Sequence, residues 1–519
     1  MSLAYDPRPN PEWEEGPPPA NAEAPAVRPT PVAAARRLDR RGPLRPGQLI
    51  SSRARMNGEV LAHTFRFVDG AAVVALSWFA CDLVNPAGLW ASSVGRVAPF
   101  AFGATLLLLA MQAAGAHGFR PRESLALHLG RIAGAFALTG GLLAIALGAA
   151  HEPRAVWEGH GVLLCLAFAS LYLLHICWWF AVRRLRRSGH LTPNEVVVGA
   201  TPNAETLIDK ALKSREVAVL GVFDDRKGRA PDAVRGVPLL GDTRALIGHR
   251  IMPYVDRVVI TVTASAQTRV RGLVEKLRVL PNEITLFVDF GADAASGAAL
   301  WRLADMPLAR LSGAKADARR AFVKRIQDLA IGAAGLVAVA PIMALVALAI
   351  RLDSPGPIFF RQRRHGFNNE DIIVWKFRSM RHEMRDEHAS RQVCAGDPRV
   401  TRVGAFIRKT SLDELPQLIN VLKGEMSLVG PRPHAPGMKT GDVESARLVA
   451  EYAHRHRMKP GMTGWAAIKG SRGPVDTPEQ VRRRVALDIE YIERQSFWLD
   501  LFIIAVTLPV LLGDRRAAR

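Results

Sequence analysis

The sequence predicts an integral membrane protein of the α plus α/β class. Hydrophobic residues make up 49% of the 519-residue chain, and they gather in long stretches. Four of these stretches approach the length of about 20 residues that a helix needs to cross a bilayer. They are 66–85, 97–116, 132–150 and 161–182. Beyond them, from 194 to 312, strand-like and helix-like segments alternate as in an α/β domain.

The basic composition narrows the possible partners. The chain has 69 Lys and Arg against 48 Asp and Glu, a formal net charge of +21. A basic surface suits either nucleic acid or an anionic membrane face, but the sequence has no helix-turn-helix, zinc-finger or aromatic-basic RNA-binding signature. The apolar stretches and the positive charge together predict a membrane protein whose basic inner face contacts membrane lipids. We expect no nucleic-acid partner.

Residues 1–60 are rich in Pro, Ala and Arg and lack the apolar core of a signal peptide. We predict a disordered cytoplasmic tail. The four cysteines form no C-x-x-C pair, so they indicate neither a zinc site nor a disulfide framework, which fits a protein facing the reducing cytoplasm. They are Cys81, Cys165, Cys177 and Cys394.

The four apolar stretches define a predicted transmembrane region of four helices, 61–187. The first stretch contains Asp69, which weakens its prediction as a span. Basic residues cluster at both ends of the region and in its middle loop, while the other two loops hold one arginine each, Arg96 and Arg154. Because strongly basic loops stay in the cytoplasm, both ends of this region are predicted to be cytoplasmic.

Residues 190–315 are predicted to form a Rossmann-like cytoplasmic domain. "EVVVGATPNAETLIDKAL" has the pattern of a buried strand, a turn and a helix, and "VAVLGVFDD" and "VDRVVITVT" are further strands. The first turn keeps Gly199 but has Thr201, Pro202 and Ala204 where a glycine-rich G-x-G-x-x-G turn is required. The pattern favours a degenerate domain with a structural or regulatory role. A nucleotide-sugar epimerase or dehydratase remains the alternative for this domain.

Two further apolar segments follow. Residues 328–350 are long enough to span the membrane, but basic residues on both flanks favour the cytoplasm for both ends and Pro341 kinks the helix midway. From the residues alone, a span and a re-entrant helix both remain open. Residues 496–513 are short for a span and are interrupted by Asp500 and Pro509, so we predict that this segment lies in the membrane interface.

The stretch "KTSLDELPQLINVLKGEMSLVGPRP", residues 409–433, places Asp413 and Glu414 side by side. One interpretation is structural: a helix begins near Asp413, Ser411 and Glu414 have the capping-box spacing, and Gly424 ends the helix. The other interpretation is that the two carboxylates carry out chemistry.

Five cations occur near this pair or in a nearby strand pattern: Lys376, Arg378, Arg408, Lys409 and Arg432. Lys376 and Arg378 stand at i and i+2, which on a strand is one face. Clustered ammonium and guanidinium groups suit a pyrophosphate, although a basic face on anionic lipid gives the same pattern. Carboxylates beside a phosphate need either a bridging cation such as Mg²⁺ or a role as nucleophile, in which an aspartyl phosphate forms.

From about Arg319 to the C-terminus, the chain resembles the catalytic domain of the bacterial sugar transferases, the polyprenyl-phosphate hexose-1-phosphate transferases. The matching stretches occur in the order of that family. They are "KRIQDLAIG", "SPGPIFFRQRRHG", "VWKFRSM", "DPRVTRVGAFIRKTSLDELPQLINVLKGEMSLVGPRPHA", "KPGMTGW" and "WLDL". The preceding spans and Rossmann-like domain resemble the large, multi-domain branch, and "GPRPHA" and "KPGMTGWA" look most like the branch that uses UDP-glucose.

The resemblance implies a reaction. Asp413 would attack the β-phosphorus of a UDP-sugar, UMP would leave, and undecaprenyl phosphate would then accept the sugar phosphate from the aspartyl intermediate. Asp413 and Glu414 would hold Mg²⁺, and Glu414 would help to hold the metal or assist proton transfer. This is the first membrane step of exopolysaccharide biosynthesis. Glucose is the sugar implied, with galactose and an acetamido sugar left open.

The resemblance also implies binding roles. Arg408 would contact phosphate, and residues 431–433, Pro-Arg-Pro, would lie on the uridine side. Pro431, Arg432 and Pro433 are those residues. Lys376 and Arg378 would line the pocket.

The implied architecture is monotopic. Residues 319–519 would form a catalytic domain on the cytoplasmic face of the bacterial inner membrane, held by a re-entrant helix that breaks at Pro341. The family often has Ser-Pro at this break, whereas this chain has Ala340-Pro341; the serine that helps to satisfy freed backbone groups is absent, but the proline is kept. Homo-oligomerisation stays open. The alternative function is a catalytically inactive membrane scaffold or regulator of polysaccharide assembly.

Overall fold

The computed structural model describes the chain between residues 50 and 513, with gaps. The described residues are 50, 54–85, 94–120, 123–214, 216–226, 231–262, 267–287, 300–303, 306–312, 317–384, 397–435, 437–440, 443–445, 448–449, 451–471, 473, 475 and 477–513. The predicted tail at 1–60 lies mostly outside them, as does Cys394.

Five described helices are long and apolar enough to cross a membrane. They are α1 (Gly58–Val84), α2 (Val94–Ala113), α3 (Leu125–Ala149), α4 (Arg154–Arg187) and α8 (Ala318–Asp353). Each of the four predicted stretches falls on one of the first four helices, with differences at the ends, and the 328–350 segment lies within α8. Helices α1 and α3 begin earlier than the apolar stretches because polar caps precede them: the side chains of Asn57 and Ser124 accept hydrogen bonds from Glu59 N–H and Leu127 N–H.

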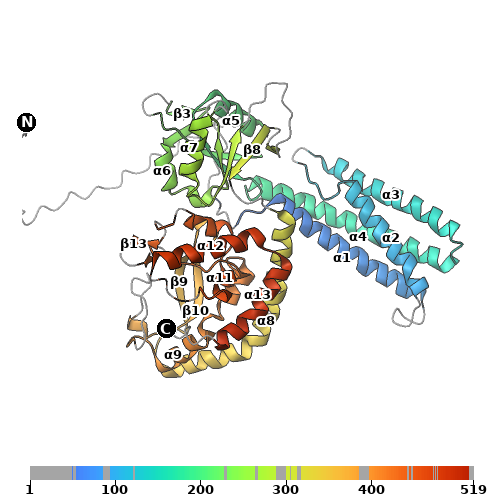
Figure 1. The fold of residues 1–519 in the computed structure, drawn as a ribbon. Helices are drawn as coiled ribbons and strands as arrows, with labels where there is room; N and C mark the ends of the chain where they lie inside the picture. Colours follow the sequence, from blue (N-terminus) through green and yellow to red (C-terminus); the bar gives the residue numbers. More distant parts are fainter. Residues whose placement is uncertain are drawn as a thin grey trace, which may run out of the picture. The chain divides into compact units, whose positions relative to one another are not determined.

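Helices α1 to α4 pack against one another around a shared apolar core (Figure 1). Each contributes at least one almost fully buried side chain to that core: Val73, Met111, Ile132 and Leu171. Each also carries large apolar side chains on its outer surface, including Phe79, Leu109, Ile145 and Leu173, which are 50–70% exposed. An apolar outer surface of this kind is compatible with surrounding lipid.

The middle region forms an eight-stranded mixed sheet with the order β3-β4-β2-β1-β5-β6-β8-β7. Its five central strands are parallel, as the βα alternation predicts. They are β4 (Val237–Gly241), β2 (Ala218–Phe223), β1 (Asn194–Val198), β5 (Arg257–Ile260) and β6 (Glu283–Phe287). The antiparallel strands are β3 (Ala233–Val234), β7 (Leu300–Leu303) and β8 (Met306–Ser312).

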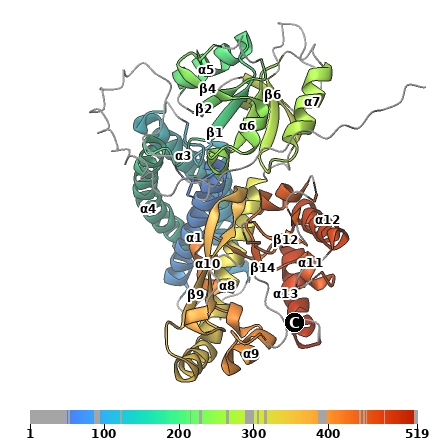
Figure 2. The ribbon, with the colours of Figure 1, turned by 90° about the vertical axis from the view of Figure 1, so that its left-hand side faces the viewer.

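Helices cover both faces of this sheet (Figure 2). The helix α5 (Pro202–Ser214) packs on the face that carries Val197, while α6 (Thr243–Ile247) and α7 (Gln267–Leu277) pack on the face that carries Val196. The two valines are neighbours on β1 and point to opposite faces because strand side chains alternate. The fully buried β1 is therefore apolar on both sides, which is why its sequence reads as a continuous apolar run.

The C-terminal region is built from short elements around α8. A hairpin-like pair, β9 (Phe359–His365) and β10 (Asp371–Phe377), is antiparallel, and β11 (Ser427–Val429) pairs with β14 (Gly461–Thr463) in parallel. The helices are α9 (Arg402–Lys409), α10 (Gln417–Lys423), α11 (Trp465–Ile468), α12 (Pro478–Arg494) and α13 (Phe497–Gly513). The described 3₁₀ turns of this region are η3 (Phe367–Asn369), η4 (His382–Met384), η5 (Leu412–Glu414) and η7 (Tyr452–Arg457), and β12 (Lys439–Thr440) pairs with β13 (Val443–Glu444). The turn η2 (Met252–Tyr254) belongs to the middle region, between α6 and β5.

The helix α8 has two different halves. In its first half, Lys324 is buried and contacts Asp500 of α13. In its second half, Val337, Leu345 and Leu352 are 67–79% exposed. Pro341 lies inside the helix, and the axis of α8 bends part-way along its length in Figure 1. The first half therefore anchors α8 to the domain, and the second half presents an apolar surface.

Asp500 interrupts the apolar sequence of α13 but is not exposed. It is 1% exposed, and its carboxylate accepts hydrogen bonds from Lys324 Nζ (2.8 Å), Tyr491 Oη (2.7 Å) and Gln495 Nε2 (3.1 Å). A buried carboxylate requires such partners. Asp500 therefore fastens α13 to α8 and α12, and the charge that breaks the apolar pattern serves this junction.

Candidate active site

The acidic pair lies on the 3₁₀ turn η5, between α9 and α10. Ser411 precedes this turn with a left-handed backbone (φ 57°), and its side chain makes no cap hydrogen bond. The N–H of Glu414 donates instead to the carbonyl of Ser411, at 3.2 Å. The predicted capping box is therefore wrong, and the helix begins at Gln417 and not near Asp413. Its predicted end at Gly424 is confirmed, because that residue takes the left-handed conformation (φ 81°) that suits glycine.

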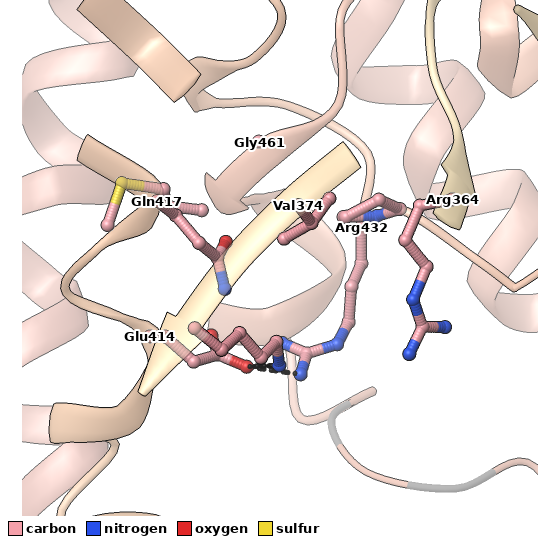
Figure 3. A pocket seen from close by; sticks show the side chains of 9 residues that line it. Arg364, Val374, Glu414, Gln417, Arg432 and Gly461 are labelled. Carbon is pink, nitrogen blue, oxygen red and sulfur yellow. Dashed lines mark hydrogen bonds and ion pairs between the residues drawn. The ribbon is translucent and has the colours of Figure 1, made fainter. Parts of the chain in front are cut away.

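Glu414 is held by two cations from different elements. Its Oε1 lies 2.9 Å from Lys376 Nζ, on β10, and 2.9 Å from Arg432 Nη2, in the segment after β11. Figure 3 shows both ion pairs meeting at this oxygen. Through these two ion pairs, Glu414 joins η5, β10 and the segment after β11, which are far apart in the sequence.

The neighbouring carboxyls have opposite pKa shifts. Burial alone would raise the pKa of Glu414, but Arg432 and Lys376 outweigh burial and hold it well below its usual range. Burial raises the pKa of Asp413 to about 6, and the charge of Glu414 adds to the rise, against the opposing effect of Lys376 and Arg408. Among the described residues, none donates a hydrogen bond to the Asp413 carboxylate. Asp413 is therefore the less engaged of the two and is largely ionised only above pH 6.

A pocket opens beside Glu414, with about 330 Å³ of empty space that is partly open to solvent. Its lining is mostly polar and cationic and includes Arg364, Lys376, Gln417, Arg432 and Pro433. Three cations around one carboxylate leave excess positive charge in this pocket. The arrangement suits an anionic ligand such as a phosphate group.

Arg364 is a pocket residue that the sequence reasoning did not single out. It pairs with Ile372 across the β9–β10 ladder, and Val374 and Lys376 follow at i+2 and i+4 on the same face. Burial, together with the nearby charge of Arg432, lowers the pKa of Arg364 to about 10. Strand alternation from Lys376 could have identified Arg364, but only with the register of the two strands in hand.

Arg378, which was predicted to share a strand face with Lys376, makes its hydrogen bonds elsewhere. The i, i+2 pattern places Lys376 and Arg378 on one strand face, but β10 ends at Phe377. The buried guanidinium of Arg378 donates to the carbonyls of Ser354 (2.6 Å) and Pro355 (2.5 Å), just after α8. The structure does not place Arg378 among the residues that line the pocket, and its bonds favour a structural role at the end of α8.

The remaining predicted residues surround the acidic pair less directly. Arg408 is half-buried in the last turn of α9, and no described hydrogen bond engages its guanidinium. Pro433 lines the pocket, whereas Pro431 is buried and its carbonyl accepts a hydrogen bond from Gly461 N–H, at 2.9 Å. The Pro-Arg-Pro segment is thus fixed against β14, with Arg432 facing Glu414.

A buried network behind the pocket positions Arg432. Arg455 is 1% exposed, pairs with Asp488 at 2.7 Å and donates to the carbonyl of Arg432 at 2.9 Å. His434 and Tyr452 complete this network with a 2.5 Å hydrogen bond. None of these residues was predicted, since a single buried arginine in "YAHRHR" gives no pattern that separates it from its exposed neighbours.

In the turn after β1, a protein carboxylate occupies one of the backbone N–H groups. The carboxylate of Asp224 accepts the N–H of Ala200 at 2.7 Å and pairs with Arg226 at 2.7 Å. Burial opposes ionisation of Asp224, but these bonds lower its pKa to about 2. A protein carboxylate therefore occupies an N–H of the turn that would face a phosphate, which supports the interpretation of a degenerate domain.

Two family models match different parts of the chain. The family model described as bacterial sugar transferase matches residues 319–514, and that of a CoA-binding domain matches residues 114–287. The chain is 42% identical over 304 residues to an undecaprenyl-phosphate glucose phosphotransferase of Komagataeibacter xylinus, which covers 58% of this chain and 56% of that protein.

Two further relatives match a shorter part of the chain. A UDP-glucose:undecaprenyl-phosphate glucose-1-phosphate transferase of Caulobacter vibrioides is 48% identical over 194 residues, 37% of this chain and 71% of that protein. A UDP-N-acetylgalactosamine-undecaprenyl-phosphate N-acetylgalactosaminephosphotransferase of Aeromonas hydrophila is 40% identical over 192 residues, 37% and 44% of the two chains. The match to the Komagataeibacter protein spans little more than half of its length.

Proposed function

Because the chain belongs to the bacterial sugar transferase family, we propose that it transfers a hexose 1-phosphate from a UDP-sugar to undecaprenyl phosphate and releases UMP. The observation that carries this proposal is a cationic pocket that Glu414 lines, with Asp413 next to Glu414 on the same turn. The reaction is the first membrane step of exopolysaccharide synthesis, carried out at the cytoplasmic face of the inner membrane.

The proposed reaction has two displacements at one phosphorus. In the first, an oxygen of the ionised Asp413 carboxylate bonds to the β-phosphorus, and the bond from that phosphorus to the bridging oxygen breaks, so UMP leaves with the electron pair. In the second, a phosphate oxygen of undecaprenyl phosphate bonds to the same phosphorus and the acyl phosphate bond breaks. Undecaprenyl-diphosphate-linked sugar is formed and the carboxylate is regenerated.

The two carboxyls divide the work according to their surroundings. Glu414 is pinned by Lys376 and Arg432, so it is poorly placed to attack. Asp413 has no such partner among the described residues, and its pKa of about 6 leaves it ionised near neutral pH yet more basic than an ordinary aspartate. These properties support Asp413 as the nucleophile.

The cations provide the sites for phosphate. Lys376, Arg364 and Arg432 face the pocket, and forked guanidinium donors match pairs of phosphate oxygens. Arg408, half-buried and without a described hydrogen bond, adds a donor on the Asp413 side. We propose that Pro433 contacts the uridine portion, because it continues the pocket wall beyond Arg432.

The acidic pair also fits Mg²⁺. Both described ion pairs of Glu414 fall on Oε1, which leaves Oε2 without one, and the Asp413 carboxylate is not engaged by described donors. One or two carboxylates completed by water and phosphate oxygens are the usual ligands of this ion. We propose that Asp413 and Glu414 hold it; when bound, it supplies positive charge that offsets the charge of the pyrophosphate.

We propose glucose as the sugar, supported by the names of the Komagataeibacter and Caulobacter relatives. The Aeromonas relative takes an acetamido sugar at comparable identity, so identity alone does not select the hexose. The test is UMP release by the full chain in nanodiscs containing undecaprenyl phosphate, with UDP-glucose, UDP-galactose and UDP-N-acetylgalactosamine compared. Fastest release with UDP-glucose supports the proposal, and no release with any of the three contradicts the transferase function.

The exchange rate should fall at low pH as Asp413 becomes protonated; we call this fall the acid limb of the pH–rate profile. Since a protonated carboxyl is a poor nucleophile, exchange of labelled UMP into UDP-sugar should fall as the pH drops through about 6. Lys376 lowers the pKa of Asp413, so Lys376→Met should move this limb to higher pH, whatever it does to the maximal rate. The exposed Lys409 is the matched control, and Lys409→Met should leave the limb in place. If the acid limb of Lys376→Met lies at the same pH as that of the wild type, the assignment of the limb to Asp413 is contradicted.

We propose further that α8 is re-entrant and does not cross the membrane. Support comes from Pro341, from the bend of α8, and from the cations on both flanks. In a chain without its native cysteines, Ala316→Cys and Arg516→Cys should both resist an impermeant thiol reagent in intact cells, while His151→Cys, in the predicted outer loop, should react.

The kink at Pro341 gives a second prediction, which is tested in the same chain without native cysteines. Pro341→Leu restores a straight helix, so a fraction of Arg516→Cys should become reactive in that variant. Reaction of Arg516→Cys with Pro341 in place would rule out the re-entrant helix.

A further inference from the structure

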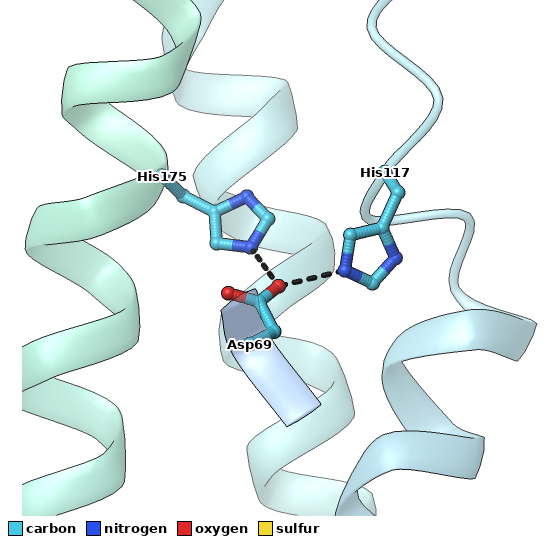
Figure 4. A group of neighbouring side chains, drawn as sticks. All are labelled: Asp69, His117 and His175. Atoms are coloured by element: carbon cyan, nitrogen blue, oxygen red, sulfur yellow. Dashed lines mark hydrogen bonds and ion pairs between the residues drawn. The ribbon is translucent and has the colours of Figure 1, made fainter. Parts of the chain in front are cut away.

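Asp69 places a carboxylate inside the four-helix core, and two histidines meet it (Figure 4). Its Oδ2 lies 2.6 Å from His117 Nε2 and 3.1 Å from His175 Nε2. Asp69 comes from α1, His175 from α4, and His117 from the segment after α2. The exposed fractions are 0%, 0% and 5%. The residue that weakened the sequence prediction of the first span is thus the centre of a buried cluster.

An outer hydrogen bond fixes one of the histidines. The Nδ1 of His175 lies 3.0 Å from His128 Nε2, from α3. The Nδ1 of His128 lies 3.3 Å from Arg131 Nη2 and 3.7 Å from Glu123 Oε1. With Nδ1 committed to His128, the Nε2 of His175 points at Asp69. Metal-binding histidines are typically oriented in this way by a partner on the second ring nitrogen.

The cluster is incompletely satisfied within the described residues. Asp69 Oδ1 and His117 Nδ1 are buried and lack a hydrogen-bond partner. Leaving a buried polar atom unpaired is costly, and a carboxylate oxygen more so. If the cluster served only to tie helices together, this arrangement would leave two such atoms unexplained.

The donor set and its spacing fit a tetrahedral metal. The candidate ligand atoms of Asp69, His117 and His175 all lie within 4.8 Å of one another. Bonds of about 2.0–2.1 Å in a tetrahedron place neighbouring ligand atoms about 3.3 Å apart, so the observed 2.6 and 3.1 Å contacts need to open by about 0.7 and about 0.2 Å. Two imidazoles and one carboxylate are borderline ligands that favour Zn²⁺ over Mg²⁺ or Ca²⁺.

We propose that Asp69, His117 and His175 bind one Zn²⁺, with a fourth position for water, and that the ion joins α1, α4 and the segment after α2. His128 is a positioning residue that holds the ring of His175. This site is separate from the acidic pair of the transferase region and does not depend on the proposed function.

The test is metal binding by the full chain, purified without a histidine tag in nanodiscs, stripped with a chelator and dialysed against Zn²⁺. One Zn²⁺ per chain should remain beyond the amount held by His117→Gln, a substitution in the turn after α2 and not within a helix, and His175→Gln should lose the same equivalent. His160→Gln is the matched control, because His160 is a buried histidine of α4 that bonds to the carbonyls of Val156 and Pro99. It should retain the ion.

Two further readouts keep the outcome decisive. Co²⁺ in the stripped chain should give the intense visible absorption of a tetrahedral site, absent in His117→Gln. Zn²⁺ should raise the unfolding temperature of the wild-type chain and of His160→Gln but not of His117→Gln. Equal Zn²⁺ content in wild type and folded His117→Gln, or no Zn²⁺ retained by the wild type, would overturn the proposal and leave a hydrogen-bonded cluster.

Discussion

Asp413→Asn is expected to reduce exchange of labelled UMP into UDP-sugar by about a thousandfold or more. The amide lacks the charge and basicity of the carboxylate, so it cannot form the acyl phosphate, and one of the two proposed Mg²⁺ ligands is weakened. The exchange assay omits undecaprenyl phosphate, so it reports the first displacement alone. A structural role predicts little change in exchange, because asparagine has nearly the shape of aspartate and is equally suited to turns.

The controls separate chemistry from folding. Asp371→Asn changes an exposed aspartate on β10 in the same region and should leave exchange unchanged. Glu414→Gln removes the partner of Lys376 and Arg432 and should reduce activity strongly, while some exchange persists because the nucleophile remains. Normal exchange by a folded Asp413→Asn protein would return the acidic pair to a structural role.

The second large effect concerns stability. Asp500→Ala should lower the free energy of unfolding by about 3–5 kcal/mol, since it leaves the buried ammonium of Lys324 without its closest partner. Helix α13 would then lose the hydrogen bonds of Asp500 to Lys324 of α8 and Tyr491 of α12. The change is measured by equilibrium denaturant titration of the full chain in nanodiscs, followed by tryptophan fluorescence.

Two control variants test whether the loss of stability comes from the buried Lys324–Asp500 pair. In the double variant Lys324→Met/Asp500→Leu neither charge is buried, so it should be less destabilised than Asp500→Ala alone. Arg482→Met removes an exposed pair with Glu479, whose side chains are 61% and 75% exposed, and should change stability by less than about 1 kcal/mol. Equal losses in the Asp500 and Arg482 variants would contradict the role of Asp500.

The membrane helices were predictable because length and hydropathy are local properties. The same local reasoning treated Asp69 as a defect in the first span. The structure places His117 and His175 beside it, but these residues lie 48 and 106 positions away in the sequence. Similarly, Asp500 looks like an interruption of α13 until Lys324, 176 positions earlier, is brought to it.

At the candidate site, residue types were predictable and their placement was not. The adjacent carboxylates and nearby cations indicated phosphate chemistry, and Lys376 and Arg432 do meet at Glu414. The left-handed Ser411 cannot be read from a serine, so the capping box failed. Arg378 was misplaced because the end of β10 decides which face the residue takes, and Arg364 was overlooked because its position depends on strand register.

The central claim is that Asp413 forms a covalent bond to the phosphorus of the sugar phosphate. Trapping this aspartyl intermediate tests the claim most directly. The full chain in nanodiscs is mixed with UDP-glucose and Mg²⁺ without undecaprenyl phosphate, quenched in acid, digested and examined by mass spectrometry. The account predicts UMP release in proportion to enzyme and a hexose-phosphate adduct on the peptide that contains Asp413. Undecaprenyl phosphate should then discharge the adduct. UMP release that requires undecaprenyl phosphate, with no adduct on that peptide, would contradict it.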